Sequence, residues 1–253
     1  MNMSKNMTKP QAMKRDYEHY LGRWSDGLDR KMKQNPALFE RFLAMVKVPE
    51  RRNAVSEMDR ALIGVAVVCN VTNSHPERRD AYIRRVLAAG GNRAQILEAM
   101  QLGSVLGIHA LSVAVPVLVE ALEEEGWDLR DIYELDERQQ ALKAQFTEVR
   151  GYWHHTWDPI LALDPDMFEA YLGYSMLPAD SGTLDVRQRE LIYIAIDSVA
   201  THLYVPGIKL HVVNALQAGV TMDEILTAIE IASLIGADPL FDAIETLPQP
   251  GQD

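Results

Sequence analysis

The spacing of apolar and polar residues predicts helices along most of the chain, and one helix carries charge where an apolar face is expected. Apolar residues recur every three to four positions in three successive segments between Asp185 and Ile235. In the first segment Glu190, Asp197 and Thr201 fall within roughly 40° of one another at about 100° per residue. Because a buried carboxylate is costly unless it is paired or used, this stripe is a candidate site.

The same helical pattern occurs twice. When the sequence is shifted by 129 residues, the two halves align without a gap. Identical pairs in this register include Trp24 and Trp153, Phe39 and Phe168, Arg60 and Arg189, Gly90 and Gly219, and Gly107 and Gly236. No segment alternates with a period of two, so an all-α fold made of a tandem duplication is predicted.

This repeat sets the expected domain boundaries. We predict a disordered tail over 1–15, a first helical repeat over 16–125, an acidic linker over 126–140 and a second repeat over 141–253. The opening helices are expected near 17–33 and 142–153, each beside a tryptophan. A further helix over 111–123 is expected to bend or begin at Pro116.

The two repeats differ at the polar stripe. Glu190 aligns with Ala61, Asp197 aligns with Val68, and His211 in the following helix aligns with Tyr82. Since the first repeat builds the same pattern without these charges, they are not required for folding. They are therefore expected to serve chemistry, and the first repeat is expected to have a structural role or to complete the pocket rather than to form a second active site.

Composition narrows the range of partners. The formal net charge of −11 disfavours nucleic acids and anionic membranes. One cysteine, Cys69, excludes an internal disulfide or a CxxC redox pair. Apolar runs such as 111–119 are too short to span a bilayer, and the amino-terminal residues do not resemble a secretory signal. We expect a cytoplasmic protein that acts on a small molecule.

The stretch RELIYIAIDSVATHLYVPGIKLHVVNALQAGVTMDEI closely resembles the carboxymuconolactone decarboxylase family, which includes the alkylhydroperoxidase D-like proteins. The resemblance rests on Arg-Glu at the start of an apolar helix, a histidine eight residues before a glycine, and a helix beginning Thr-x-x-Glu. It implies a helical fold and a homo-oligomer, with a trimer favoured for a tandem chain. It also implies chemistry without a cofactor.

The resemblance also assigns site residues. The family glutamate falls on Glu190 and the family histidine on His211, which we take as catalytic. The two cysteines of the peroxidase branch would fall on Tyr204 and Gly207, so dithiol peroxide reduction is not expected. The predicted activity is decarboxylation or isomerisation of a small carboxylated lactone or ring acid in aromatic-compound catabolism. A redox role within the superfamily and a non-catalytic binding or assembly role are the alternatives.

Further side chains are candidates for the same site. His202 is a second candidate for the acid, and the expected substrate-binding residues are Asp197, Thr201, Tyr204 and Arg189. Arg189 has the counterpart Arg60, which also favours a structural role. The carboxylates and histidines are of types that bind zinc or iron, but no pair has the tight spacing of a dedicated metal motif. No metal is therefore expected.

Overall fold

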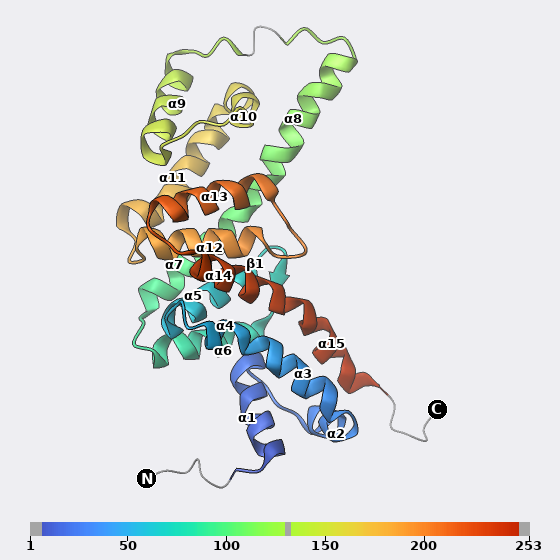
Figure 1. Cartoon of the computed structure of the whole chain (residues 1–253). Helices are drawn as coiled ribbons and strands as arrows, with labels where there is room; N and C mark the ends of the chain where they lie inside the picture. The colour runs from blue at the N-terminus through green and yellow to red at the C-terminus, as the bar shows by residue number, and fades with distance from the viewer. Residues whose placement is uncertain (1–6, 130–132, 248–253) are drawn as a thin grey trace. The chain divides into compact units, whose positions relative to one another are not determined.

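The computed structural model describes residues 7–129 and 133–247 and confirms the all-helical fold (Figure 1). In this part of the chain the strands are limited to β1 (Cys69–Asn70) and β2 (Asn73–Ser74), which pair antiparallel. The chain divides into two compact units. Unit 1 combines Met1–Ser104 with Gly182–Asp253, and unit 2 is Val105–Ser181.

The helices of each unit follow in chain order. Unit 1 contains α1 (Lys9–Leu21), α2 (Asp26–Gln34), α3 (Pro36–Val46), α4 (Val48–Arg52), α5 (Glu57–Val67), α6 (Pro76–Ala88) and α7 (Arg93–Ser104). It also contains α12 (Val186–Asp197), α13 (Val205–Gln217), α14 (Met222–Leu234), η4 (Ile235–Ala237), α15 (Asp238–Ala243) and η5 (Ile244–Thr246). Unit 2 contains η2 (Val105–Gly107), α8 (Ile108–Glu124), α9 (Glu137–Arg150), α10 (Trp157–Leu163) and α11 (Pro165–Ser181).

Helices α5 and α12 form the centre of unit 1. They pack against each other, with α6 and α7 on α5 and with α13 and α14 on α12. Both are buried over most of their length, as expected of helices that are apolar on nearly every side. Their first turns are capped, because the side chains of Ser56 and Asp185 accept hydrogen bonds from the backbone N–H groups of Asp59 and Gln188.

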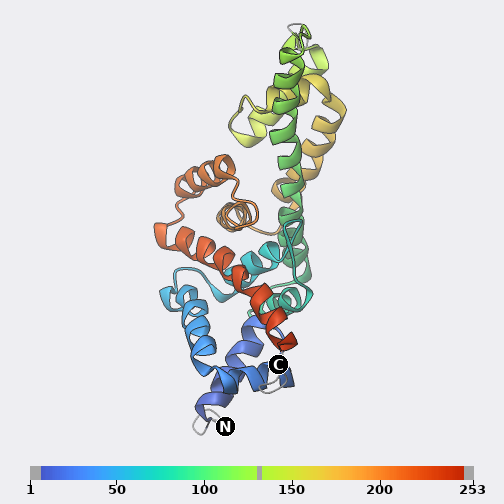
Figure 2. The same ribbon diagram turned by 90° about the vertical axis from the view of Figure 1, so that its right-hand side faces the viewer.

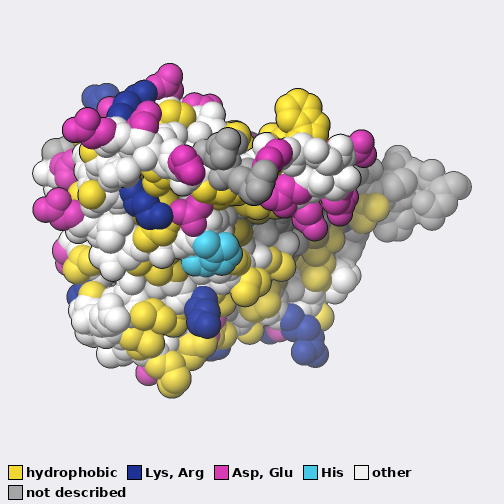
Figure 3. Space-filling view, turned by 90° about the horizontal axis from the view of Figure 1, so that it is seen from above, with side chains coloured by type: hydrophobic (Ala, Val, Ile, Leu, Met, Phe, Trp, Pro, Cys, Tyr) yellow, Lys and Arg dark blue, Asp and Glu magenta, His cyan; other side chains and the backbone are white. Residues whose placement is uncertain are grey.

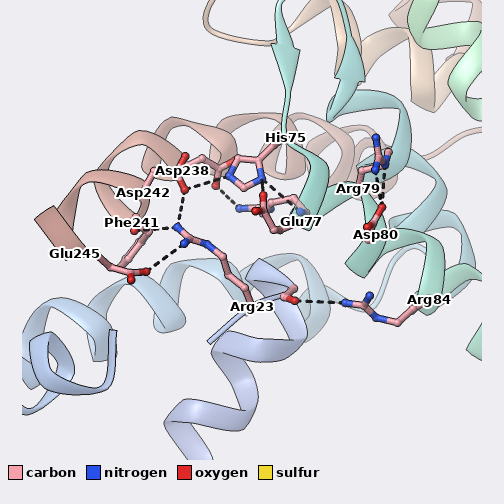
Figure 4. Close-up of polar contacts among 12 residues, drawn as sticks. Arg23, His75, Glu77, Arg79, Asp80, Arg84, Asp238, Phe241, Asp242 and Glu245 are labelled. Atoms are coloured by element: carbon pink, nitrogen blue, oxygen red, sulfur yellow. Dashed lines mark hydrogen bonds and ion pairs between the residues drawn. The ribbon is translucent and has the colours of Figure 1, made fainter. Parts of the chain in front are cut away.

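Helix α15 packs on the opening helices of unit 1 (Figure 2). The buried ring of Phe241 has its centroid 4.6 Å from that of Phe42 and 5.3 Å from that of Tyr17. Arg23 follows α1 and donates hydrogen bonds to the Phe241 carbonyl and to Asp242 (Figure 4). Aromatic packing and these polar contacts together hold α15 in place.

The core of unit 2 has a related organisation. Its buried cluster comes from α9–α11, and Leu111 and Val115 of α8 pack against it. In each unit, the helix that ends one predicted repeat therefore covers the opening helices of the other. Consequently, the compact units do not coincide with the predicted repeats over 16–125 and 141–253. The duplication itself stays a prediction from the sequence.

Three boundaries differ from the sequence prediction. Of the predicted tail over 1–15, residues 1–6 lie outside the described part, while 9–15 belong to α1, since Thr8 forms a capping box with Gln11. The single helix expected over 17–33 is two helices, because Gly22 adopts a φ of 77° and ends α1. Helix α9 begins within the expected linker, at a capping box between Asp136 and Gln139.

One helical stretch is longer than the apolar runs suggested. Residues Arg93–Glu124 are long and apolar enough to cross a membrane by length and composition. Pro116 lies inside α8 without ending it. Helix α7, the first part of the stretch, packs against α5 and α12, and 39% of the most apolar 18 residues of the stretch is buried.

The molecular surface agrees with the negative net charge. The face seen from above Figure 1 carries more acidic than basic side chains, and hydrophobic side chains reach the surface among them (Figure 3). Helix α8 contributes the exposed side chains of Val113, Val117 and Leu118 to the surface of unit 2.

Candidate active site

The two residues predicted to be catalytic lie in contact. Glu190 is in the second turn of α12 and His211 is in the second turn of α13, and these two helices pack together. Glu190 Oε2 lies 2.7 Å from His211 Nδ1, and the two side chains are 12% and 16% exposed. An ionised carboxylate only accepts hydrogen bonds, so Nδ1 donates to it. This leaves Nε2 as the ring nitrogen available to a ligand.

A tyrosine outside the predicted set of site residues completes this group. Tyr193 stacks on His211, with ring centroids 4.4 Å apart and an interplanar angle of 20°. It follows Glu190 by three residues, so both side chains lie on one face of α12. The alignment of the two halves could have indicated Tyr193. Like Glu190, which aligns with Ala61, Tyr193 aligns with a small residue, Gly64.

Asp197 ends α12 and is buried, with 2% of its surface exposed. Its Oδ2 atom has no hydrogen-bond partner among the described residues and faces Gly207 in the first turn of α13. Burial raises the pKa of the Asp197 carboxyl to about 7, and the His211 imidazole partly opposes the rise. Asp197 therefore retains a proton over much of the range in which Asp is normally ionised.

His202 and Tyr204 lie near Asp197. His202 Nε2 is 4.0 Å from Asp197 Oδ1, and burial lowers the pKa of the His202 imidazole. The Tyr204 backbone N–H donates to the Asp197 carbonyl at 3.0 Å. Thr201 is exposed, and its hydroxyl lies 3.5 Å from the Thr72 carbonyl oxygen.

Arg189 makes the same contact as its counterpart in the first repeat. Its guanidinium donates to the carbonyl of Leu184, and that of Arg60 donates to the carbonyl of Val55. Each acceptor lies five residues upstream of the arginine. This shared contact gives position 189 a structural role, and binding of a substrate carboxylate by Arg189 stays a prediction.

A different cluster surrounds the positions in the first half of the chain that match Gly207 and His211. Arg78, which aligns with Gly207, is 1% exposed. It pairs with Asp238 Oδ1 at 2.5 Å and donates to the Tyr82 hydroxyl at 3.1 Å. Asp238 opens α15 close to His75, which begins α6 (Figure 4). Arg78 and Tyr82, which align with Gly207 and His211, thus belong to a buried cluster that includes Asp238 of α15.

The geometry of the second repeat suits proton transfer. A histidine whose Nδ1 is bound by a carboxylate has a fixed tautomer and a stabilised cationic form, as in hydrolase triads. Glu190 and His211 are also of the types that bind metals. Here, however, the carboxylate oxygen and the ring nitrogen are bound to each other.

Comparison with known proteins gives the same family as the sequence motif. The model of the carboxymuconolactone decarboxylase family matches residues 165–246. A solved structure, described as a "putative gamma-carboxymuconolactone decarboxylase subunit" from Burkholderia xenovorans LB400, is 39% identical with a TM-score of 0.84. The match covers 94% of this chain and 98% of that one. No curated protein matches the chain. The chain therefore belongs to the carboxymuconolactone decarboxylase family.

Proposed function

We propose that the protein is a cofactor-free lyase that decarboxylates, or isomerises, a small carboxylated lactone or ring acid of aromatic-compound catabolism. The observation that carries this proposal is the 2.7 Å contact between Glu190 and His211, which lie on two helices packed together in unit 1. The solved relative whose name indicates a gamma-carboxymuconolactone decarboxylase subunit supports the choice of substrate class.

The proposed roles follow from the direction of the hydrogen bond. Loss of CO₂ breaks the bond between the carboxylate carbon and the ring and leaves its electron pair in a dienolate. That anion is then protonated on carbon. His211 Nε2 delivers this proton, and Glu190 stabilises the imidazolium form through Nδ1. His202 is the second candidate for the acid, and Asp197, Tyr204, Thr201 and Arg189 remain proposed substrate contacts.

The redox alternative has little support in this chain. Tyr204 and Gly207 occupy the positions at which the peroxidase branch has cysteines. Cys69 is partly buried, and burial raises the pKa of its thiol, whereas a reactive cysteine requires a lowered one. A peroxide-consumption assay with a thiol reductant tests this alternative, and no turnover is expected.

The proposed trimer is supported by apolar side chains on the surface. Val205, Val213 and Leu216 of α13 are 69%, 44% and 53% exposed. An apolar face of this kind favours a partner surface over contact with water. Light scattering on the purified protein gives the mass in solution, and a monomer would exclude the trimer.

Turnover of γ-carboxymuconolactone and close analogues, followed by CO₂ release and by ultraviolet absorbance, tests the proposal. His211→Ala and Glu190→Gln are each expected to reduce kcat by about a hundredfold or more, the range typical of general acid–base groups. His154→Ala and Glu137→Gln are matched controls at exposed positions and should retain full activity. Absence of turnover by the unmodified protein, or full activity of both site variants, would contradict the assignment.

A further inference from the structure

We infer that Tyr193 is a positioning residue of the site: its ring stacks on His211 and fixes the imidazole plane, so that Nδ1 meets Glu190 while Nε2 stays directed at the substrate. The inference rests on the proposed function for its catalytic consequence. The orientation of the His211 ring by Tyr193 does not depend on which substrate is bound.

Two contacts of different direction hold the imidazole. The hydrogen bond from Nδ1 to Glu190 lies in the plane of the ring. By itself it does not prevent the imidazole from turning about its Cβ–Cγ bond, which would move Nδ1 away from the carboxylate. The Tyr193 ring covers one face of the imidazole at a centroid distance of 4.4 Å and a tilt of 20°. Stacking therefore opposes the rotation that the hydrogen bond permits, and Nε2 keeps one direction.

One helix supplies both contacts. Glu190 and Tyr193 are three residues apart on α12, whose core position is set by its packing on α5, α13 and α14. Side chains at this spacing are neighbours on the helix surface. A rigid, buried helix thus presents the carboxylate and the aromatic ring as a single frame for His211, which comes from α13.

The matching positions in the first half of the chain lack this arrangement. Ala61, Gly64 and Tyr82 stand at the positions of Glu190, Tyr193 and His211. A Cβ atom at Gly64 would overlap the Tyr82 ring, so a larger side chain at position 64 is excluded once position 82 is tyrosine. The pair of core helices forms without an aromatic residue at position 64, so the fold itself does not require one. The aromatic residue at position 193 occurs together with Glu190 and His211, which indicates that the three residues serve the same site.

The test compares variants that keep or remove the ring. Protein labelled with ¹⁵N-histidine is studied by NMR for the unmodified chain, Tyr193→Phe, Tyr193→Leu and Tyr193→Met, with His211→Ala to assign the signal. When the imidazole is neutral, the unmodified chain and Tyr193→Phe should show His211 with its proton on Nδ1, and in the imidazolium form both ring nitrogens carry a proton. Tyr193→Leu and Tyr193→Met should show a mixture of the two tautomers. Circular dichroism establishes that each variant is folded, and the two aliphatic variants guard against one of them failing to fold.

Turnover of γ-carboxymuconolactone supplies the second readout. In the aliphatic variants kcat should fall about ten- to a hundredfold with little change in KM, since misplacing a reactive group has effects of this size. Tyr193→Phe should restore activity, and Tyr174→Leu, at an exposed position of α11, is the control. Unchanged His211 tautomer signals in the folded aliphatic variants would overturn the inference. If the signals change but no variant, including the unmodified protein, turns the lactone over, the positioning role stands and the proposed function fails.

Discussion

Asp197 occupies the space in which a side chain at position 207 would begin, since a Cβ atom built on Gly207 would overlap Asp197 Oδ2 and lie 2.7 Å from Tyr204 Cδ1. In the first half of the chain, Val68 at the position of Asp197 has a shorter side chain without δ atoms, and Arg78 stands at the position of Gly207. With Asp197 in this position, only glycine fits at position 207 without a shift of the Asp197 carboxyl group.

Gly207→Ala is expected to destabilise the protein by about 1–3 kcal/mol, the usual cost of overpacking a core. Adding Asp197→Ala should recover part of the loss, because the atom that Cβ overlaps is then absent. Chemical denaturation measures both effects. Gly173→Ala is the matched control, since a Cβ there meets nothing within 4 Å, and it should be neutral or stabilising. If Gly207→Ala and Gly173→Ala lost equal amounts of stability, Asp197 would not be the reason that position 207 requires glycine.

Asp197 should make stability fall as pH rises. Its pKa is about 7 in the folded protein against an ordinary value of 3.8. Between these values the folded state binds the proton that the unfolded state has released, so stability declines from about pH 4 to pH 7 and is flat above. The loss is at most on the order of 4 kcal/mol. Asp197→Asn should therefore stabilise the protein more at pH 8 than at pH 5.

Denaturation curves at the two pH values measure this difference. Asp166→Asn changes a carboxylate whose side chain is 84% exposed and should give the same result at both. If Asp197→Asn also gave equal changes at pH 5 and pH 8, Asp197 would not carry a raised pKa.

Breaking the buried pair of Arg78 and Asp238 should be costly. Both side chains are nearly fully buried, so Asp238→Asn leaves the Arg78 charge without its counterion, a change that typically costs about 3–5 kcal/mol. Replacing both by apolar residues, Arg78→Met with Asp238→Leu, should cost less than the single change. The exposed pair of Arg138 and Asp166 is the control, and its removal should change stability by less than about 1 kcal/mol. Thermal denaturation distinguishes the two pairs.

Phe241→Ala should weaken the attachment of α15 to α1 and α3. Phe241 is 1% exposed among aromatic rings, and truncation of a buried phenylalanine costs about 3–5 kcal/mol. Leu240→Ala, one residue earlier on the exposed side of the same helix, should cost less than about 1 kcal/mol. Hydrogen exchange of the α1 and α3 amides should rise for the first variant and stay unchanged for the second.

Local signals predicted most helices and the central pair of the site. Thr221 caps a helix as the Thr-x-x-Glu motif indicates, and Glu190 and His211, which the resemblance to the family assigned as catalytic, lie in contact. These features depend on residues a few positions apart or on one helix pair. The helix starts are therefore readable from spacing, and the Glu190–His211 pair is what the resemblance to the family implies.

Other features depend on contacts that spacing does not encode. The stacking of Tyr193 on His211 requires the direction of two rings, and the end of α1 at Gly22 requires a backbone conformation rather than a polarity pattern. The packing of α15 on α1–α3 joins segments about 200 residues apart. Periodicity predicted these helices but not which of them would meet.

The attachment of α15 to the opening helices has a consequence for synthesis of the protein. Tyr17, Phe39 and Phe42 leave the ribosome long before Phe241, the ring that completes their cluster. The nascent chain thus carries an uncovered aromatic surface while almost all of the later helices are translated. Folding of the amino-terminal helices is expected to finish late. Chaperones that bind exposed apolar segments can therefore bind α1–α3 for longer than other helices during synthesis.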